Sequence, residues 1–246
     1  MKIIISPAKK MRTDNDDMAH RSLPIFIKEA ERLKDCLCGM TYDELKKLWG
    51  CNDSIAGLNY NRLRDMDLYT NLTPAILAYD GIQYQYMAPQ VFEDKYFEYI
   101  EEHLRIISGF YGILRPFDGI TPYRLEMQAK LRTDFCKNLY DYWDEKIYNE
   151  VTKDDDLILN LASTEYSKTV TKYISGEVRM TSFVFGELAG DKIKEKGVYV
   201  KMARGEMVRY MAENNITDIK DMQSFDRLGF RYSDEYSQPD QYVFLK

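Results

Sequence analysis

Residues 106–127 read IISGFYGILRPFDGITPYRLEM, and the rest of the chain is organised around this stretch. It opens with a short apolar run that ends at Ser108-Gly109, which is typical of a buried strand that stops abruptly. Glycines, prolines and an Asp-Gly pair then turn the backbone repeatedly. Connecting loops are usually small and polar, whereas this one is aromatic and carries Arg115 and Arg124. We expect a packed loop that directs polar groups at a ligand; the alternative is that either arginine pairs with Glu126 and pins a long connection.

The composition is that of a folded protein with a sizeable core. Hydrophobic residues make up 45% and charged residues 30% of the 246-residue chain, which are ordinary globular values. No apolar run approaches the roughly 18 residues needed to span a bilayer, and the apolar run at residues 3–5 is too short for a signal peptide. We therefore expect a cytoplasmic protein with no membrane partner. With no repeat, linker or boundary in view, residues 1–246 are predicted to form a single domain.

Metal and disulfide chemistry have little support in the sequence. There are only two histidines, which excludes a multi-histidine metal centre. The one close cysteine pair, Cys36 and Cys38, has neither zinc-ligand spacing nor the Cys-x-x-Cys spacing of redox proteins. We expect reduced thiols, no metal site and no cofactor.

Strands and helices alternate along the chain, which predicts a mixed α/β fold with a mixed sheet and surrounding helices. The apolar runs Lys2–Ile5 and Leu157–Leu161 are the clearest buried strands. The runs 178–188 and 198–203 are strand-like and predict an antiparallel hairpin, and a closing strand or pair is expected within 225–245. Helices are expected at residues 24–39, 41–49, 54–64, 91–104, 139–151 and 164–174.

A helical hairpin of helix-hairpin-helix size is predicted at residues 41–66. Thr41 and Glu44 form a capping box that opens its first helix. In hairpins of this kind the turn and a helix N-terminus can hold a DNA phosphate. However, the usual Gly-hydrophobic-Gly turn is absent and Asp53 has the wrong charge, so the residues alone favour an ordinary packed hairpin.

Basic residues cluster after predicted strand ends although the net charge is −6. If these strand ends converge, an acidic protein has one positive cleft, which suits a nucleic acid or a nucleotide. Tyrosine is frequent, and Tyr79, Tyr84, Tyr111 and Tyr123 are candidates for stacking on bases. The basic candidates are Lys9, Lys10 and Arg12, then Arg115 and Arg124, then Lys168, and finally Lys201, Arg204 and Arg209.

A second hypothesis is an enzyme that acts on a nucleotide or a nucleic-acid base in the same cleft. Ser163 and Glu165 follow a predicted strand, where ligands of α/β proteins bind. Glu126 or Glu165 would act as general base and Arg115 or Arg124 as phosphate clamp, with Ser163 as a further candidate. The alternative at this strand exit is that Ser163 and Glu165 only cap the following helix.

Six motifs in one order resemble a known family, the YaaA family of bacterial peroxide-stress proteins. They extend over nearly the full length of the chain, so the resemblance is specific. The motifs are Ser6-Pro7-Ala8-Lys9, residues 78–81 (AYDG), 108–116 (SGFYGILRP) and 122–127 (PYRLEM), Asn160-Leu161-Ala162-Ser163 with Glu165-Tyr166, and Ala203-Arg204-Gly205.

The resemblance implies a cytoplasmic protein associated with limiting free iron during hydrogen peroxide stress and with binding DNA through a positive cleft. It implies a single mixed α/β domain with a helix-hairpin-helix element. It also implies that Lys9, Arg115, Arg124, Lys168, Lys201 and Arg204 face one cleft. From the clustered cations together with the resemblance, we expect duplex DNA as the partner, bound with weak sequence preference. This chain departs from the family pattern at Ile82-Gln83, at Gln128 and in the poorly glycinated hairpin turn.

Overall fold

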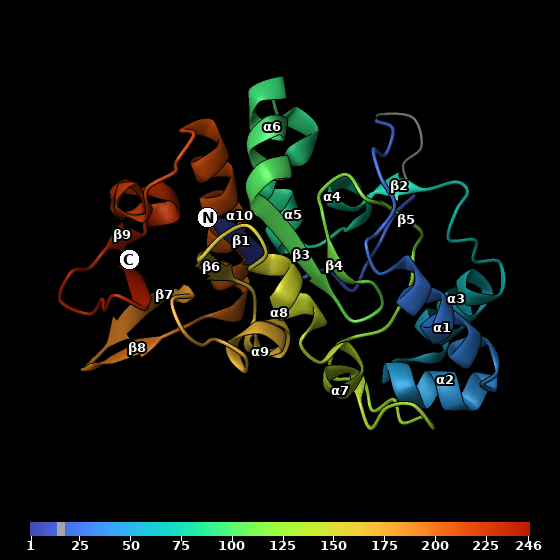
Figure 1. The fold of residues 1–246 in the computed structure, drawn as a ribbon. Helices are drawn as coiled ribbons and strands as arrows, with labels where there is room; N and C mark the ends of the chain where they lie inside the picture. Colours follow the sequence, from blue (N-terminus) through green and yellow to red (C-terminus); the bar gives the residue numbers. More distant parts are fainter. Residues whose placement is uncertain (14–17) are drawn as a thin grey trace.

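The computed structural model describes residues 1–13 and 18–246, and a mixed β-sheet lies at its centre (Figure 1). Its strand order is β4-β3-β1-β6-β7-β10-β9, with β8 paired to β7. Strands β3, β1, β6, β7 and β10 run parallel, whereas β4, β8 and β9 are antiparallel to their neighbours. The bounds are β1 Lys2–Ile5, β3 Leu104–Ser108, β4 Gly112–Leu114, β6 Leu157–Leu161, β7 Arg179–Ala189, β8 Lys192–Lys194, β9 Arg231–Tyr232 and β10 Gln241–Leu245.

Helices cover both faces of the sheet and a helical region lies beside it (Figure 1). One face carries α5 (Ile82–Met87), α6 (Asp94–His103) and α10 (Gly197–Glu213), and the other carries α8 (Lys146–Val151) and α9 (Thr164–Thr171). The region beside the sheet contains α1 (Ile27–Cys38), α2 (Tyr42–Trp49) and α3 (Asp53–Arg64). The remaining elements are β2 Thr73–Pro74, α4 Ala75–Ala78, η1 Pro89–Val91, β5 Gly119–Ile120, α7 Leu139–Trp143, η2 Ile219–Ser224 and η3 Arg227–Gly229.

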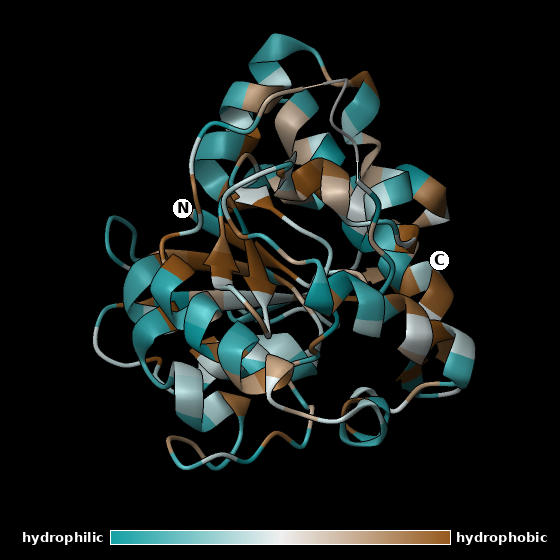
Figure 2. Ribbon diagram, turned by 90° about the vertical axis from the view of Figure 1, so that its right-hand side faces the viewer, coloured by the Kyte–Doolittle hydropathy of each residue, from teal (hydrophilic) through white to brown (hydrophobic). Residues whose placement is uncertain are grey.

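The strands predicted from apolar runs are confirmed. Strands β1 and β6 have the predicted bounds, and Ile3, Ile4 and Ile5 have no exposed surface. Strands of a parallel sheet covered on both faces are apolar throughout because neither face meets water. Figure 2 shows these hydrophobic strands at the centre, surrounded by helices with hydrophilic outer surfaces. None of the described helices is both long and apolar enough to cross a membrane.

The strand predicted at residues 198–203 is wrong, because these residues lie within the long helix α10. A short apolar run cannot by its pattern alone be told from a buried helical segment. Contact between α10 and α5 decides the outcome: a Cβ on Gly205 would lie 2.1 Å from the backbone oxygen of Gln83. The hairpin partner of β7 is instead the short strand β8. As a result, Lys201, Arg204 and Arg209 are helical residues and do not follow a strand.

The helical hairpin is formed by α2 and α3. The capping box is confirmed, because the Thr41 side chain accepts a hydrogen bond from the Glu44 amide while the Glu44 carboxylate accepts one from the Thr41 amide. Gly50 ends α2 with a φ of +55°, a left-handed conformation that favours glycine. Asn52 then caps α3 by accepting a hydrogen bond from Ile55. The two helices pack against each other through a tight three-residue connection.

Candidate nucleic-acid interface

The central stretch crosses the end of β3, turns back as β4 and later returns to the carboxyl end of the sheet. Ser108 Oγ stabilises the first turn by accepting hydrogen bonds from the amides of Phe110 (3.1 Å) and Tyr111 (2.9 Å). Gly109 then lies directly against the backbone of residues 125–127, because a Cβ at this position would lie 2.4 Å from the Leu125 oxygen. This close approach positions the segment that carries Arg124 and Glu126.

Tyr123 anchors the same segment to the core. Its hydroxyl is 2.7 Å from Ser108 Oγ and 2.8 Å from the hydroxyl of Tyr79, so the three side chains form a buried hydrogen-bonded chain. Tyr123 is only 7% exposed, and burial raises its pKa to about 12. Tyr79, Tyr84 and Tyr111 are buried as well. The expectation that these four tyrosines can stack on exposed bases is therefore wrong, because their rings are committed to the core.

Replacing Tyr123 by phenylalanine is expected to lower the free energy of unfolding by about 1–3 kcal/mol, because the change deprives two buried hydroxyls of a shared partner. Urea denaturation of the variant and the wild type measures this difference. Tyr86→Phe is the matched control: Tyr86 is half-buried, so its loss of a hydroxyl should have almost no effect. Equal stabilities of Tyr123→Phe and the wild type would contradict a structural role for this hydroxyl.

Lys9 and Arg124 meet at one carboxylate. Lys9 Nζ is 2.7 Å from Glu126 Oε2, and an Arg124 guanidinium nitrogen is 3.0 Å from Glu126 Oε1. Lys9 follows β1 and Arg124 belongs to the central stretch, so the sequence prediction that these two basic residues converge is confirmed. The alternative that Arg124 pairs with Glu126 is also confirmed. The two cations therefore share the Glu126 carboxylate.

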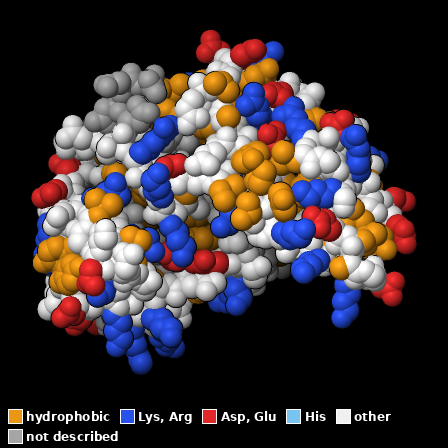
Figure 3. All heavy atoms as spheres, turned by 180° about the vertical axis from the view of Figure 1, so that it is seen from behind, with side chains coloured by type: hydrophobic (Ala, Val, Ile, Leu, Met, Phe, Trp, Pro, Cys, Tyr) orange, Lys and Arg blue, Asp and Glu red, His pale blue; other side chains and the backbone are white. Residues whose placement is uncertain are grey.

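A groove of about 640 Å³ opens beside this corner, between α2 with its turn and residues 124–132. Its walls carry five basic side chains and only two acidic ones, Glu44 and Glu126. The basic residues are Lys9, Lys47, Arg124, Lys130 and Arg132. Figure 3 shows lysine and arginine side chains gathered at the lower left of the rear face, on the side of the molecule that carries the helical hairpin. An acidic protein therefore has a locally positive groove, which we call the basic groove.

Sequence reasoning missed three residues of the basic groove: Lys47, Lys130 and Arg132. Lys47 is an exposed residue of α2, and the other two are exposed residues of the loop that follows the central stretch. None of them follows a strand, so a search for basic strand exits passes over them. The usable signal was the predicted hairpin itself, whose first helix forms one wall of the groove.

Arg115 does not belong to the basic groove. It follows β4, which runs antiparallel to β3, so this exit leads toward the amino ends of the parallel strands. There the Arg115 side chain pairs with Asp118, with 3.3 Å between Nε and Oδ1. The Arg115 backbone amide also donates a hydrogen bond to Asp118 Oδ2, and Arg105 lines the same small cavity. The expectation that all the basic strand exits converge is thus wrong, because the direction of β4 cannot be deduced from its apolar run.

The remaining basic candidates are not among the residues that line the groove. Lys168 is exposed on α9, one turn after Glu165, and Lys201 is exposed on α10. Arg204 is mostly buried on α10, and this burial lowers its pKa. Arg209 Nε is 2.7 Å from Glu213, which also contacts Arg227. Arg209 therefore takes part in an ion-pair network that joins α10 to η3.

Ser163 and Glu165 follow β6 at the carboxyl end of the sheet. The Ser163 amide donates to Ser6 Oγ (2.8 Å), and the Ser163 side chain makes no capping hydrogen bond to α9. Glu165 accepts a hydrogen bond from the Gln128 amide at 3.1 Å. This contact connects the loop after the central stretch to α9. Burial, together with the nearby charge of Glu126, raises the pKa of Glu165. Across the described ranges no three His, Cys, Asp or Glu side chains come together to hold a metal ion.

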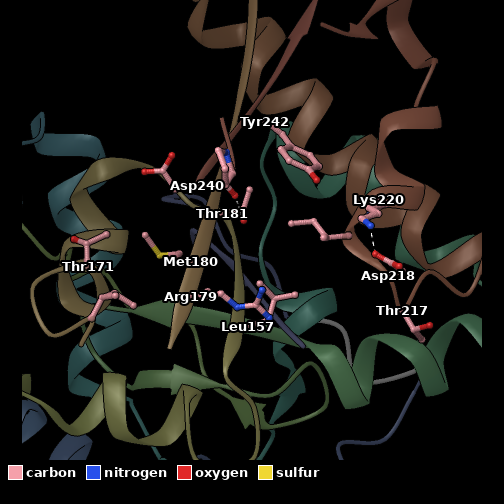
Figure 4. Close-up of a pocket in the computed structure, with 13 residues that line it drawn as sticks. Leu157, Thr171, Arg179, Met180, Thr181, Thr217, Asp218, Lys220, Asp240 and Tyr242 are labelled. Atoms are coloured by element: carbon pink, nitrogen blue, oxygen red, sulfur yellow. Dashed lines mark hydrogen bonds between the residues drawn. The ribbon is translucent and has the colours of Figure 1, made fainter. Parts of the chain in front are cut away.

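A larger cavity of about 850 Å³ lies at the opposite edge of the sheet, at the amino ends of β6 and β7 (Figure 4). Figure 4 shows Arg179 and Lys220 on its walls together with Asp218 and Asp240. Two positive and two negative side chains balance, so this cavity lacks the excess of positive charge that distinguishes the basic groove.

Comparison with protein families matches residues 1–236 to the family described as "Peroxide stress protein YaaA". The chain belongs to the YaaA family. All the residues that line the basic groove fall within the matched range, whereas β10 lies beyond it.

Similar YaaA-family proteins span the same length. A UPF0246 protein from Desulfitobacterium hafniense (strain Y51) is 61% identical over 246 residues, which is 100% of this chain and 98% of that protein. UPF0246 proteins from Lachnoclostridium phytofermentans and Agathobacter rectalis are 52% and 51% identical, and each alignment covers at least 96% of both chains. Family membership is consistent with a role in the response to peroxide stress.

Proposed function

We propose that this protein is a cytoplasmic peroxide-stress protein that binds DNA through the basic groove. Shielding DNA in this way would limit the damage that free intracellular iron causes under peroxide, and this effect does not require the protein to bind iron. The proposal takes its stress-response part from the family and its DNA-binding part from the geometry of the groove.

The observation that carries the proposal is the excess of positive charge in the basic groove. Five basic and two acidic side chains line it in a chain whose net charge is −6. Salt screens exposed charges beyond about 10 Å at ordinary ionic strength, so the local excess and not the net charge governs what approaches this surface. A polyanion such as DNA is the ligand class that such a groove attracts.

The form of the groove favours contacts to the DNA backbone. Lysine predominates among its exposed cations, and lysine binds phosphate as a point charge with no fixed geometry. Phosphate contacts position a protein on DNA but carry no sequence information. We therefore propose duplex DNA as the partner, bound with weak sequence preference.

The test is fluorescence anisotropy with two duplexes of unrelated sequence across a salt series. We expect similar affinities for both sequences and a steep fall with salt, with log K decreasing by about 0.9 per phosphate contact for each tenfold increase in salt. No binding at low salt, or an affinity that does not depend on salt, would contradict DNA binding.

A second candidate is an enzyme that acts on a nucleotide or nucleic-acid base in the same groove. The observation that favours it is Glu165, a half-buried carboxyl that accepts a hydrogen bond from the Gln128 amide in the groove wall and whose pKa is raised by burial and by the nearby charge of Glu126. Incubation of DNA with the protein, followed by mass spectrometry of the nucleosides, tests this candidate. Unchanged nucleosides would dismiss it.

A further inference from the structure

The basic groove has a second kind of lining that phosphate binding does not require. Besides its charged residues, its walls include apolar side chains from α2, from the segment before α2 and from the loop after the central stretch. These are Met40, Leu48, Trp49, Ala129 and Leu131. A site for backbone phosphates alone would need cations and solvent, whereas an apolar wall beside cations suits a ligand with a flat apolar part and an anionic part.

The size of the groove limits that ligand. Its volume of about 640 Å³ lies within the range of roughly 300–1,000 Å³ that is typical of pockets for small molecules. In an intact duplex the bases are stacked and paired, so a base enters a pocket only when it is unpaired or turned out of the helix. A single nucleotide satisfies both requirements, because its base is flat and its phosphate is negative.

We infer that the basic groove receives one unpaired nucleotide of the bound DNA, with its base against the apolar wall and its phosphate at the cations. The inference rests on the proposed function and adds to it a preference for DNA that contains an unpaired nucleotide. Met40, Leu48 and Ala129 are half-buried and provide the surface for the base, and the surrounding positive charge excludes cationic ligands.

The test compares a perfect duplex with the same duplex carrying a single-nucleotide bulge, again by anisotropy. Stacking of one base is expected to make the bulged duplex bind about tenfold more tightly. Equal affinities for the two duplexes would overturn the inference and leave the proposed function standing. Failure to bind either duplex would overturn the proposed function itself, so the two failures are distinguishable.

A variant whose new side chain fills the groove tests whether the preference for the bulged duplex arises there. Ala129 is half-buried in the groove wall, so Ala129→Phe is expected to reduce the ratio of the two affinities from about ten to about one, since the ring occupies the space for the base. The control is Ala189→Phe at an exposed position outside the groove, which should keep the ratio. A ratio that persists in Ala129→Phe would place the base elsewhere and overturn the inference.

Tryptophan fluorescence supplies a second measurement on the unaltered protein. Trp143 has no exposed surface and donates to the Gly109 oxygen, so a change on binding reports Trp49. Quenching by the bulged duplex but not by the perfect duplex is the expected result. Equal quenching by both would contradict the entry of a base.

Discussion

Replacing Lys47, Lys130 and Arg132 together by glutamine is expected to lower the affinity for duplex DNA by about two to three orders of magnitude at about 0.1 M salt. All three side chains are exposed and line the basic groove, so their removal does not disturb the core. Each phosphate contact that is lost also reduces the slope of log K against log salt by about one unit. A salt series on the wild type and the triple variant therefore measures both quantities.

The matched control is a triple variant at Lys153, Lys192 and Lys194, also changed to glutamine. These residues are exposed and lie outside the groove, near the start of β6 and on β8. The net charge changes equally in both variants, so a general effect of charge would weaken binding in both alike. We expect the control to keep nearly the wild-type affinity and slope. Similar losses in the two variants would mean that the groove is not where DNA binds.

Gly109→Ala is expected to destabilise the protein by about 3 kcal/mol, because the added methyl group has no room. It would lie 2.4 Å from the Leu125 oxygen and 3.0 Å from both the Glu126 carbonyl carbon and the Met127 nitrogen. All three contacts are backbone atoms, so no side chain can rotate away. For a chain of this size the melting temperature should fall by about 6–12 °C, which thermal denaturation measures.

Gly57→Ala provides the comparison. Gly57 lies within α3, and a Cβ there would meet no atom within 4 Å. Alanine loses less conformational freedom than glycine on entering a helix, so this variant should be more stable than the wild type by about 0.5–1 kcal/mol. A Gly109→Ala protein as stable as the wild type would show that residues 125–127 do not pack against the end of β3. In that case the described position of Glu126 would also be wrong.

The sequence predicted the parts of the fold that depend on local pattern. The strands at residues 2–5 and 157–161 follow from short apolar runs, which are typical of strands covered on both faces. The start of α2 follows from the Thr41–Glu44 capping box, which is a contact between residues three apart. The mixed sheet with surrounding helices was also predictable. Lys9 and Arg124 were expected to converge as strand exits, but they meet because the loop that carries Arg124 returns to the end of β3 and packs against Gly109.

Contacts between distant residues decided the rest. Residues 198–203 form a helix because Gly205 allows α10 to approach α5, and no local pattern reports that contact. Arg115 does not reach the basic groove because β4 runs antiparallel to β3. Tyr123 is not available to a ligand because its hydroxyl bonds to Ser108 and Tyr79 in the core. Lys47 and Arg132 join the basic groove only because α2 folds against the loop after the central stretch. By itself the sequence determined the strands β1 and β6 and the capped start of α2, since those depend on neighbouring residues. Only the tertiary structure decided which charges share a surface, since a groove is formed by segments that are far apart in the chain.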